Sequence, residues 1–246
     1  MKIIFRLIDI YLNASIHVAI AVFSLLQITK LSFNNTSNSN LDYFVFFATI
    51  LGYNLLRYFE VFWKGIFNLK SNVDIILVSF LSLLASICFY VALDFKIQLA
   101  FAAISLLVLT YPFIRKFPII KMVFVSFCLT LITVYILQIN SKIDFIYFLN
   151  RFIIIFCLLI PQEICDLETD SKTIKTLPQI IGIRNLKLLG YLLLLVFCFI
   201  NFNLMNFIFA TITAFSIFYS NENRSKYFAS FWVENLPIIW WILSVL

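Results

Sequence analysis

The sequence predicts an all-α, polytopic membrane protein, and three observations support this prediction. Hydrophobic residues make up 63% of the 246 positions and charged residues only 12%. The mean hydropathy is +1.03, more apolar than a water-soluble domain of this length can hide in one core. The apolar residues also recur in runs of about 20, the length that an α-helix needs to cross a bilayer.

Nine such runs are predicted to be membrane-spanning helices. They are apolar on all sides, whereas the strands of a membrane barrel would alternate in polarity. The connections are short, so a single transmembrane helical domain over residues 1–246 is expected. In chain order the predicted spans cover residues 8–29, 41–61, 73–93, 97–114, 118–139, 144–163, 186–201, 203–220 and 228–246.

Local signals support the boundaries of these spans. The first run is too long for a removable signal peptide and lacks a small-residue cleavage site, so we expect it to be retained. The polar stretch FNNTSNSN, residues 33–40, reads as a solvated linker before the second span. Pro112 and Pro118 interrupt the fourth and fifth spans only at their shared loop.

The basic residues predict the orientation. With the N terminus in the cytoplasm, 14 of the 18 lysines and arginines lie on the inner side and 4 on the outer side. A bias of this size usually sets the topology. We therefore expect an integral protein of a bacterial inner membrane, with the N terminus inside and the C terminus outside. Because these charges lie in interhelical loops, they report topology and do not indicate a nucleic-acid partner. The outer set is Lys30, Lys96, Lys142 and Arg151.

The stretch EICDLETDSKTIKTLPQIIG, residues 163–182, gathers charge at the end of the sixth span. Glu163, Asp166 and Asp170 share one face of a helix, while Glu168 falls on the far side. Converging carboxylates repel one another unless a cation lies between them, and oxygen ligands of this kind suit Mg²⁺. The alternative is a solvated helix end whose carboxylates pair with Lys172 and Lys175.

The pattern ExxDxxxD followed by KTLPxxxG resembles the second Asp-rich motif of the UbiA-type intramembrane prenyltransferases, and YPFIRK, residues 111–116, is similar to their YxxxKR segment. The resemblance implies a helical bundle around a central cavity that transfers a prenyl group from a polyprenyl diphosphate to an aromatic or hydroxyl group of a lipophilic acceptor. It implies Mg²⁺ held by Glu163, Asp166 and Asp170, with Asp166 and Asp170 as catalytic residues. The cationic clamps on the diphosphate would be Arg115, Lys116, Lys172 and Lys175.

The chain departs from the family at the first Asp-rich motif, which closes the second helix. The corresponding stretch is YNLLRYFEVFWKG, residues 53–65, and when it is anchored on Asn54 the expected aspartates fall on Leu55, Tyr58 and Phe62. One hypothesis is that Asn54 and Arg57 bind the diphosphate directly, with fixed positive charge in place of a metal ion. The competing interpretation pairs Arg57 with Glu60 on the helix surface.

Two functions therefore stay open. The first is a UbiA-like prenyltransferase, and the second is a non-catalytic UbiA-like membrane protein that binds an isoprenoid lipid or a partner protein. His17, the only histidine, is expected to form an interhelical hydrogen bond rather than to act as an acid or base. Glu234 and Asn235 lie deep enough in the last span to predict contact with a polar interior.

Overall fold

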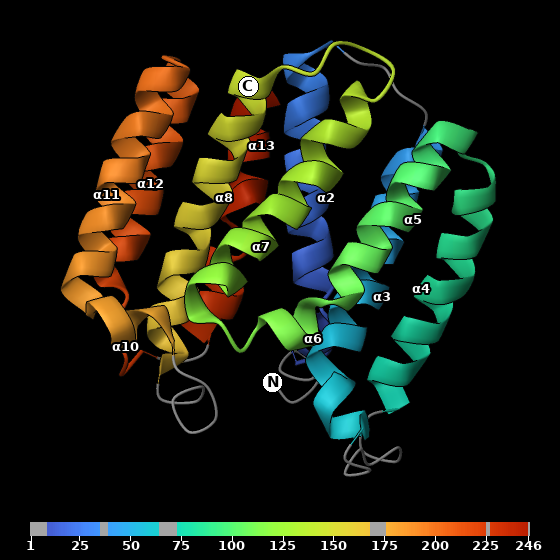
Figure 1. Ribbon diagram of the computed structural model, residues 1–246, viewed down its shortest axis with the longest axis horizontal. Coiled ribbons are helices and arrows are strands. Elements are labelled where there is room, and N and C mark those ends of the chain that lie inside the picture. Colours follow the sequence, from blue (N-terminus) through green and yellow to red (C-terminus); the bar gives the residue numbers. More distant parts are fainter. Residues whose placement is uncertain (1–8, 35–38, 64–72, 168–175, 225–226, 246) are drawn as a thin grey trace.

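The computed structural model describes residues 9–34, 39–63, 73–167, 176–224 and 227–245. Within these ranges all regular structure is helical, which confirms the predicted class, and the helices run side by side in one bundle (Figure 1). Every one of the nine predicted spans coincides with a helix or with helical pieces joined end to end.

The helices of the first half of the chain are α2 (Ile16–Ser32), α3 (Ser39–Trp63), α4 (Val73–Val91), α5 (Phe95–Leu109), α6 (Tyr111–Ile114) and α7 (Pro118–Thr130). A π-helical piece, η1 (Leu131–Tyr135), and a 3-10 piece, η2 (Ile136–Gln138), continue α7. The second half contains α8 (Phe145–Cys165), α10 (Leu177–Ile181), α11 (Ile183–Ile200), α12 (Leu204–Tyr219), the π-helical η3 (Phe228–Val233) and α13 (Leu236–Val245).

Length and composition confirm a multi-pass membrane protein. Among the described residues, six helices are long and apolar enough to cross a bilayer, and they begin at Val73, Phe95, Pro118, Phe145, Ile183 and Phe228. Two shorter apolar helices, α2 and α12, complete the set of candidates. Many large apolar side chains face outward, as expected for helices whose solvent is lipid.

The first span is interrupted near its start. The sequence indicates one continuous run from residue 8. Residues 9–13 are helical, but the helix breaks at Ala14 and Ser15, and α2 starts at Ile16. Ser15 takes a left-handed conformation with φ 59°, which is unfavourable for a residue with a side chain. Apolar periodicity does not reveal such a break, because the residues on both sides of it are equally apolar.

Two apolar cores hold the bundle together. Ile154, Ile160 and Ile164 of α8 pack with Leu186 of α11 and Phe209 of α12, and all five are buried. A second core joins α2, α3, α5 and the η1–η2 extension. Figure 1 shows the same division, with α11 and α12 on one side, α3, α4 and α5 on the other, and α2, α7, α8 and α13 between them.

Gly190 allows α11 to approach α8 and α12 closely. A Cβ atom at this position would lie 2.8 Å from Cδ1 of Ile160 and 2.9 Å from Cδ1 of Ile217. The Gly190 carbonyl also accepts a hydrogen bond from Sγ of Cys157 at 3.7 Å. The buried cysteines of the described chain, Cys128, Cys157 and Cys165, are free thiols that pack in the apolar interior.

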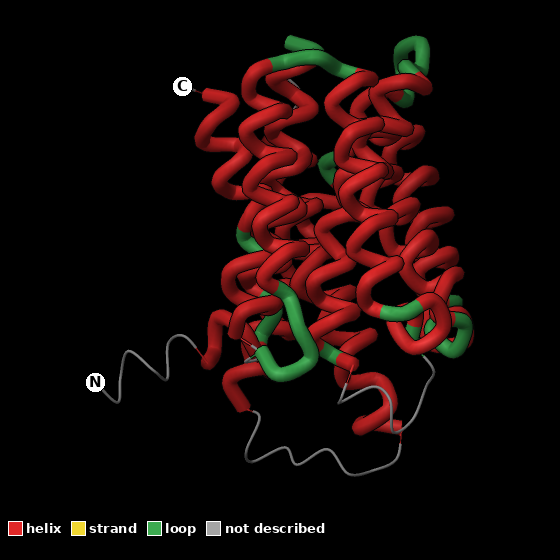
Figure 2. Tube along the Cα trace, turned by 90° about the vertical axis from the view of Figure 1, so that its left-hand side faces the viewer, coloured by secondary structure: helices red, strands yellow, loops and turns green. Residues whose placement is uncertain are grey.

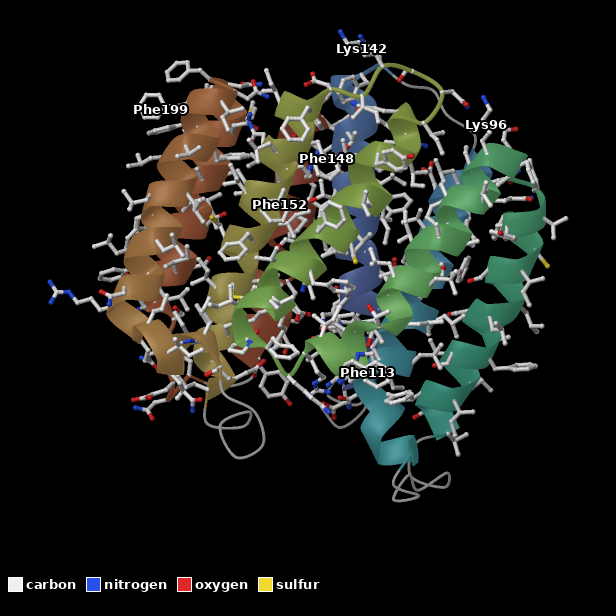
Figure 3. The ribbon with its side chains drawn as sticks, in the orientation of Figure 1. Lys96, Phe113, Lys142, Phe148, Phe152 and Phe199 are labelled. Carbon is white, nitrogen blue, oxygen red and sulfur yellow. The ribbon has the colours of Figure 1, made fainter. Side chains whose placement is uncertain are left out.

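The bundle has two distinct ends. The mouth end is where α3 and α8 finish and where α6 and α10 lie, and the far end is where α2 and α11 finish and α8 begins (Figures 1 and 2). Lys96 and Lys142 lie at the far end, opposite Phe113 of α6 (Figure 3). The described ends of α3, α8 and α12 and the α6 segment thus lie at one end of the bundle, and the assignment of that end to the cytoplasm stays a prediction.

The TLPQIIG segment forms the predicted turn into the next span. Pro178 lies in the first turn of α10, and the Gln179 side chain accepts a hydrogen bond of 3.0 Å from the Thr176 N–H. Gly182 then adopts φ 84° between α10 and α11, a conformation that favours glycine. This turn brings α11 back along α8 from the mouth end.

Candidate functional site

The end of α8 places two carboxylates at the mouth end. Glu163 is buried, and its Oε1 lies 2.6 Å from Nζ of Lys121 on α7. Its Oε2 is also buried and has no hydrogen-bond partner. Asp166 caps the C terminus of α8 and is exposed. The helix ends earlier than the predicted shared face requires, so one carboxylate is enclosed and the other faces the opening.

Part of the predicted acidic and basic cluster lies outside the described residues. The residues concerned are Glu168, Asp170, Lys172 and Lys175. Among the residues that are described, no group of three His, Cys, Asp or Glu side chains is close enough to hold a metal ion. The structure therefore brings Glu163 and Asp166 to one end of α8, one helical turn apart, and the third predicted ligand stays a prediction.

Asn54 and Arg57 bind the N-terminal segment. Nδ2 of Asn54 donates to the Ala14 carbonyl at 3.2 Å and to Oγ of Ser79 at 2.9 Å, while Oδ1 accepts from Oγ of Ser15 at 2.6 Å. Nη1 of Arg57 donates to the Leu12 carbonyl at 2.9 Å. Asn54 is 3% exposed, so its amide holds the break before α2, whereas Arg57 is exposed.

Arg115 and Lys116 lie just beyond α6, at the same end of the bundle. Arg115 is the C-terminal cap of α6 and is half-buried, and Lys116 is exposed. Their predicted pairing with an anion is untested. Their position does place two positive charges at the end of the bundle where α3 and α8 terminate.

Tyr53 lies one turn before Arg57 on α3. The charges of Glu234, Arg57 and Asp166 and the hydroxyl of Tyr111 lie close enough to act electrostatically on the Tyr53 hydroxyl. The Tyr53 side chain is 38% exposed, so its ring is accessible from outside the bundle.

A polar network near Tyr53 joins side chains from three parts of the bundle. Nε2 of His17 on α2 contacts a carboxylate oxygen of Glu234, and the other carboxylate oxygen accepts a hydrogen bond from Nε2 of Gln162 on α8. The Tyr11 hydroxyl donates to Oδ1 of Asn235 at 2.9 Å. Both expectations for this region are confirmed: His17 makes an interhelical contact, and Glu234 and Asn235 reach a polar interior.

The π-helical turn η3 explains how Glu234 and Asn235 come to face inward. Glu234 directly follows η3, and its N–H donates to the Ala229 carbonyl five residues earlier, at 3.1 Å. A π turn rotates the residues that follow it relative to an α-helix, and such turns are frequent at functional sites. Sequence periodicity assumes α-helical geometry throughout, so it does not place these two residues against α2.

Neither a known sequence family nor a curated protein matches this sequence. Solved structures, in contrast, are similar to the structure of this protein. The structure of a UbiA homolog from Archaeoglobus fulgidus bound to GPP and Mg²⁺ superposes with a TM-score of 0.53, at 13% identity, over 96% of this chain and 94% of that chain. The structure of a UbiA homolog from the same organism bound to DMAPP and Mg²⁺ gives the same identity, coverage and TM-score.

The fold defines a polytopic helical membrane protein, and its architecture is that of the Archaeoglobus UbiA homolog. The resemblance inferred from ExxDxxxD and TLP is thus confirmed at the level of the fold. The residues that sequence reasoning left out of the site are Tyr53, Lys121 and Gln162. The available signal for Tyr53 was its position four residues before Arg57, on the same face of the helix, and Lys121 and Gln162 carried none beyond topology.

Proposed function

We propose that this protein binds an isoprenoid diphosphate at the mouth end and transfers the prenyl group to a lipophilic acceptor. In this reaction the allylic carbon–oxygen bond breaks, diphosphate leaves, and an aromatic carbon or a hydroxyl oxygen of the acceptor forms the new bond and loses its proton. The UbiA fold over 96% of the chain supports the proposal. The observation that carries it is that Glu163 and Asp166, at the end of α8, lie at the same end of the bundle as the α3 and α6 segments that carry Arg57 and Arg115.

The side chains at the mouth suit the two parts of such a substrate. Arg57, Arg115 and Lys116 supply positive charge for a diphosphate, and a guanidinium matches phosphate oxygens particularly well. The aromatic rings of Tyr53 and Tyr111 come from α3 and α6 at the same end, and their faces would favour the positive charge that develops on the prenyl group. The apolar interior behind them excludes water from a reactive cation.

The carboxylates of α8 fit the Mg²⁺ that the fold implies. A magnesium ion typically takes one or two protein carboxylates together with waters and phosphate oxygens. Glu163 offers a buried oxygen that lacks a partner, Asp166 faces the opening, and the negative end of the α8 dipole points in the same direction. Bound there with Asp170, the ion would neutralise charge on the leaving diphosphate.

The test is release of diphosphate by the purified protein. We would incubate it with labelled polyprenyl diphosphates and a panel of quinone-precursor, sterol-like and glycerol-phosphate acceptors, with and without Mg²⁺. The variants are Asp166→Asn and Asp170→Asn, and the matched control is Glu222→Gln, an exposed carboxylate between α12 and η3. Metal-dependent release that both aspartate variants lose and the control keeps supports the enzyme.

The second candidate is a non-catalytic protein with the same binding site. It is favoured by the stretch of residues 53–65, in which the three positions expected to be aspartates are Leu55, Tyr58 and Phe62. Binding of the diphosphate without release in any acceptor combination would favour this candidate. An Arg57→Gln variant with unchanged diphosphate affinity would remove the proposed direct contact in either case.

A further inference from the structure

A cavity of about 230 Å³ lies at the far end of the bundle, away from the mouth. It is enclosed by the last residues of α2, α11 and α13 and by the first residues of α8 and α12. Because none of the residues proposed for diphosphate binding lines it, its chemistry is independent of the proposed function. The side chain that dominates it is Arg151.

Arg151 is a buried cation whose partners are all neutral. The residue is 2% exposed, and its Nη2 donates to Oγ1 of Thr29 at 3.0 Å and to the Tyr147 hydroxyl at 2.8 Å. Its guanidinium carbon lies 4.7 Å from the centre of the Trp240 ring. Nη1 is buried without a hydrogen-bond partner, and no carboxylate of the described residues forms an ion pair with this guanidinium.

This arrangement orients a positive charge without neutralising it. Arginine stays protonated in proteins, and a buried charge without a counter-charge is strongly unfavourable. Thr29, Tyr147 and Trp240 hold the guanidinium in place, and the Arg151 side chain lines the cavity. An anion in that cavity supplies the missing counter-charge and accepts the unused hydrogen bond.

Asn150 sets a second requirement on the chemistry of a ligand in this cavity. It is 5% exposed, its Nδ2 donates to the Phe197 carbonyl at 3.4 Å, and its Oδ1 is buried without a partner. The carbonyl partner fixes which end of the amide is the oxygen. The ligand therefore carries an anionic oxygen for Arg151 and a hydroxyl donor for Asn150, as a phosphate linked to a polyol does.

We propose that this cavity binds the phosphoglycerol headgroup of an anionic lipid from the leaflet at the far end. The volume is below the roughly 300–1,000 Å³ of pockets that enclose a drug-sized ligand, so it suits a headgroup and not the acyl chains. Leu31 at the rim is 47% exposed, and Phe199 and Phe202 nearby are 80% and 90% exposed. Phe199 points away from the bundle (Figure 3), where acyl chains would run.

The test is the thermal stability of the full chain in a neutral detergent, followed by tryptophan fluorescence because Trp240 contacts Arg151. The added probes are dihexanoyl phosphatidylglycerol, dihexanoyl phosphatidylcholine, glycerol phosphate and inorganic phosphate. We expect phosphatidylglycerol to raise the melting temperature by several degrees and phosphatidylcholine to leave it unchanged. In Arg151→Gln the apparent affinity for phosphatidylglycerol should fall at least about tenfold.

Two further variants keep the test decisive if Arg151→Gln folds poorly. Met205→Trp fills the cavity and leaves Arg151 intact, so it should lose the response to phosphatidylglycerol. Lys142→Gln removes a positive charge at the same end, outside the cavity, and should keep the response. An equal response to inorganic phosphate would keep the anion site but assign the ligand to the solvent. No response to any anion, or a response that survives Met205→Trp, would overturn the proposal.

Discussion

The Ser15 hydroxyl donates a hydrogen bond of 2.6 Å to Oδ1 of Asn54, and both side chains are buried. The same Asn54 donates to the Ala14 carbonyl, so one amide satisfies both residues of the break that precedes α2. Asn54 anchors the stretch of residues 53–65 that corresponds to the first Asp-rich motif of the UbiA-type prenyltransferases. Its observed contacts explain why an asparagine is useful there whether or not a diphosphate binds.

Replacing Asn54 by leucine should destabilise the protein by about 1–3 kcal/mol. The substitution leaves the Ser15 hydroxyl and the Ala14 carbonyl buried without their partner. Tyr58→Phe is the control, because the Tyr58 hydroxyl donates to the Asn13 carbonyl at an exposed position, and it should cost less. Unfolding in mixed micelles measures both, and equal stability of Asn54→Leu and the wild type would contradict the proposed role.

The ion pair between Glu163 and Lys121 should contribute to stability in the absence of ligand. Glu163→Gln and Lys121→Met should each cost about 1–3 kcal/mol, because each leaves a largely buried group without its counter-charge. The double variant should cost less than the sum, since it leaves no charge behind. Lys116→Met, at an exposed position, should stay within about 0.5 kcal/mol of the wild type. Strict additivity of the two single changes would show that the pair does not interact.

The contact of Glu234 with His17 and Gln162 predicts a graded series. Glu234→Gln keeps an oxygen that accepts from Gln162 and an amide that reaches His17, so we expect a small loss of stability. Glu234→Leu removes both contacts inside the bundle and should cost about 1–3 kcal/mol more than Glu234→Gln. The measurement is the unfolding midpoint in detergent for both variants and for His17→Phe. Equal unfolding midpoints for Glu234→Leu and Glu234→Gln would contradict a stabilising role for these contacts.

The close approach at Gly190 predicts a difference between two glycines. Gly52→Ala places a Cβ where no atom lies within 4 Å, and the higher helix propensity of alanine should stabilise the protein by up to about 1 kcal/mol. Gly190→Ala gains the same propensity but crowds Ile160 and Ile217, so it should be about 1–2 kcal/mol less stable than Gly52→Ala. Adding Ile160→Val to Gly190→Ala should recover part of that difference in stability. If it does not, crowding against Ile160 is not the source of the strain.

The sequence predicted the charged end of α8 but not its geometry. The spacing of Glu163 and Asp166 predicted a shared face, whereas the helix ends at Cys165, so Asp166 caps it and only Glu163 is enclosed. Where a helix stops depends on its capping contacts and on what packs around its last turn. The ion-pair partner of Glu163 is Lys121, which lies on a different helix.

The sequence by itself determined the all-helical class and the nine apolar segments, each of which coincides with helix in the structure. These follow from bilayer thickness and from the need to satisfy the backbone inside each span. The proline and glycine of TLPQIIG likewise act through local backbone preferences. Only the tertiary structure decided which polar side chains meet. The break at Ser15, the contact of His17 with Glu234 and the unneutralised Arg151 all depend on how distant helices rotate and pack. Apolar periodicity carries no information about that rotation when a helix is apolar on every side.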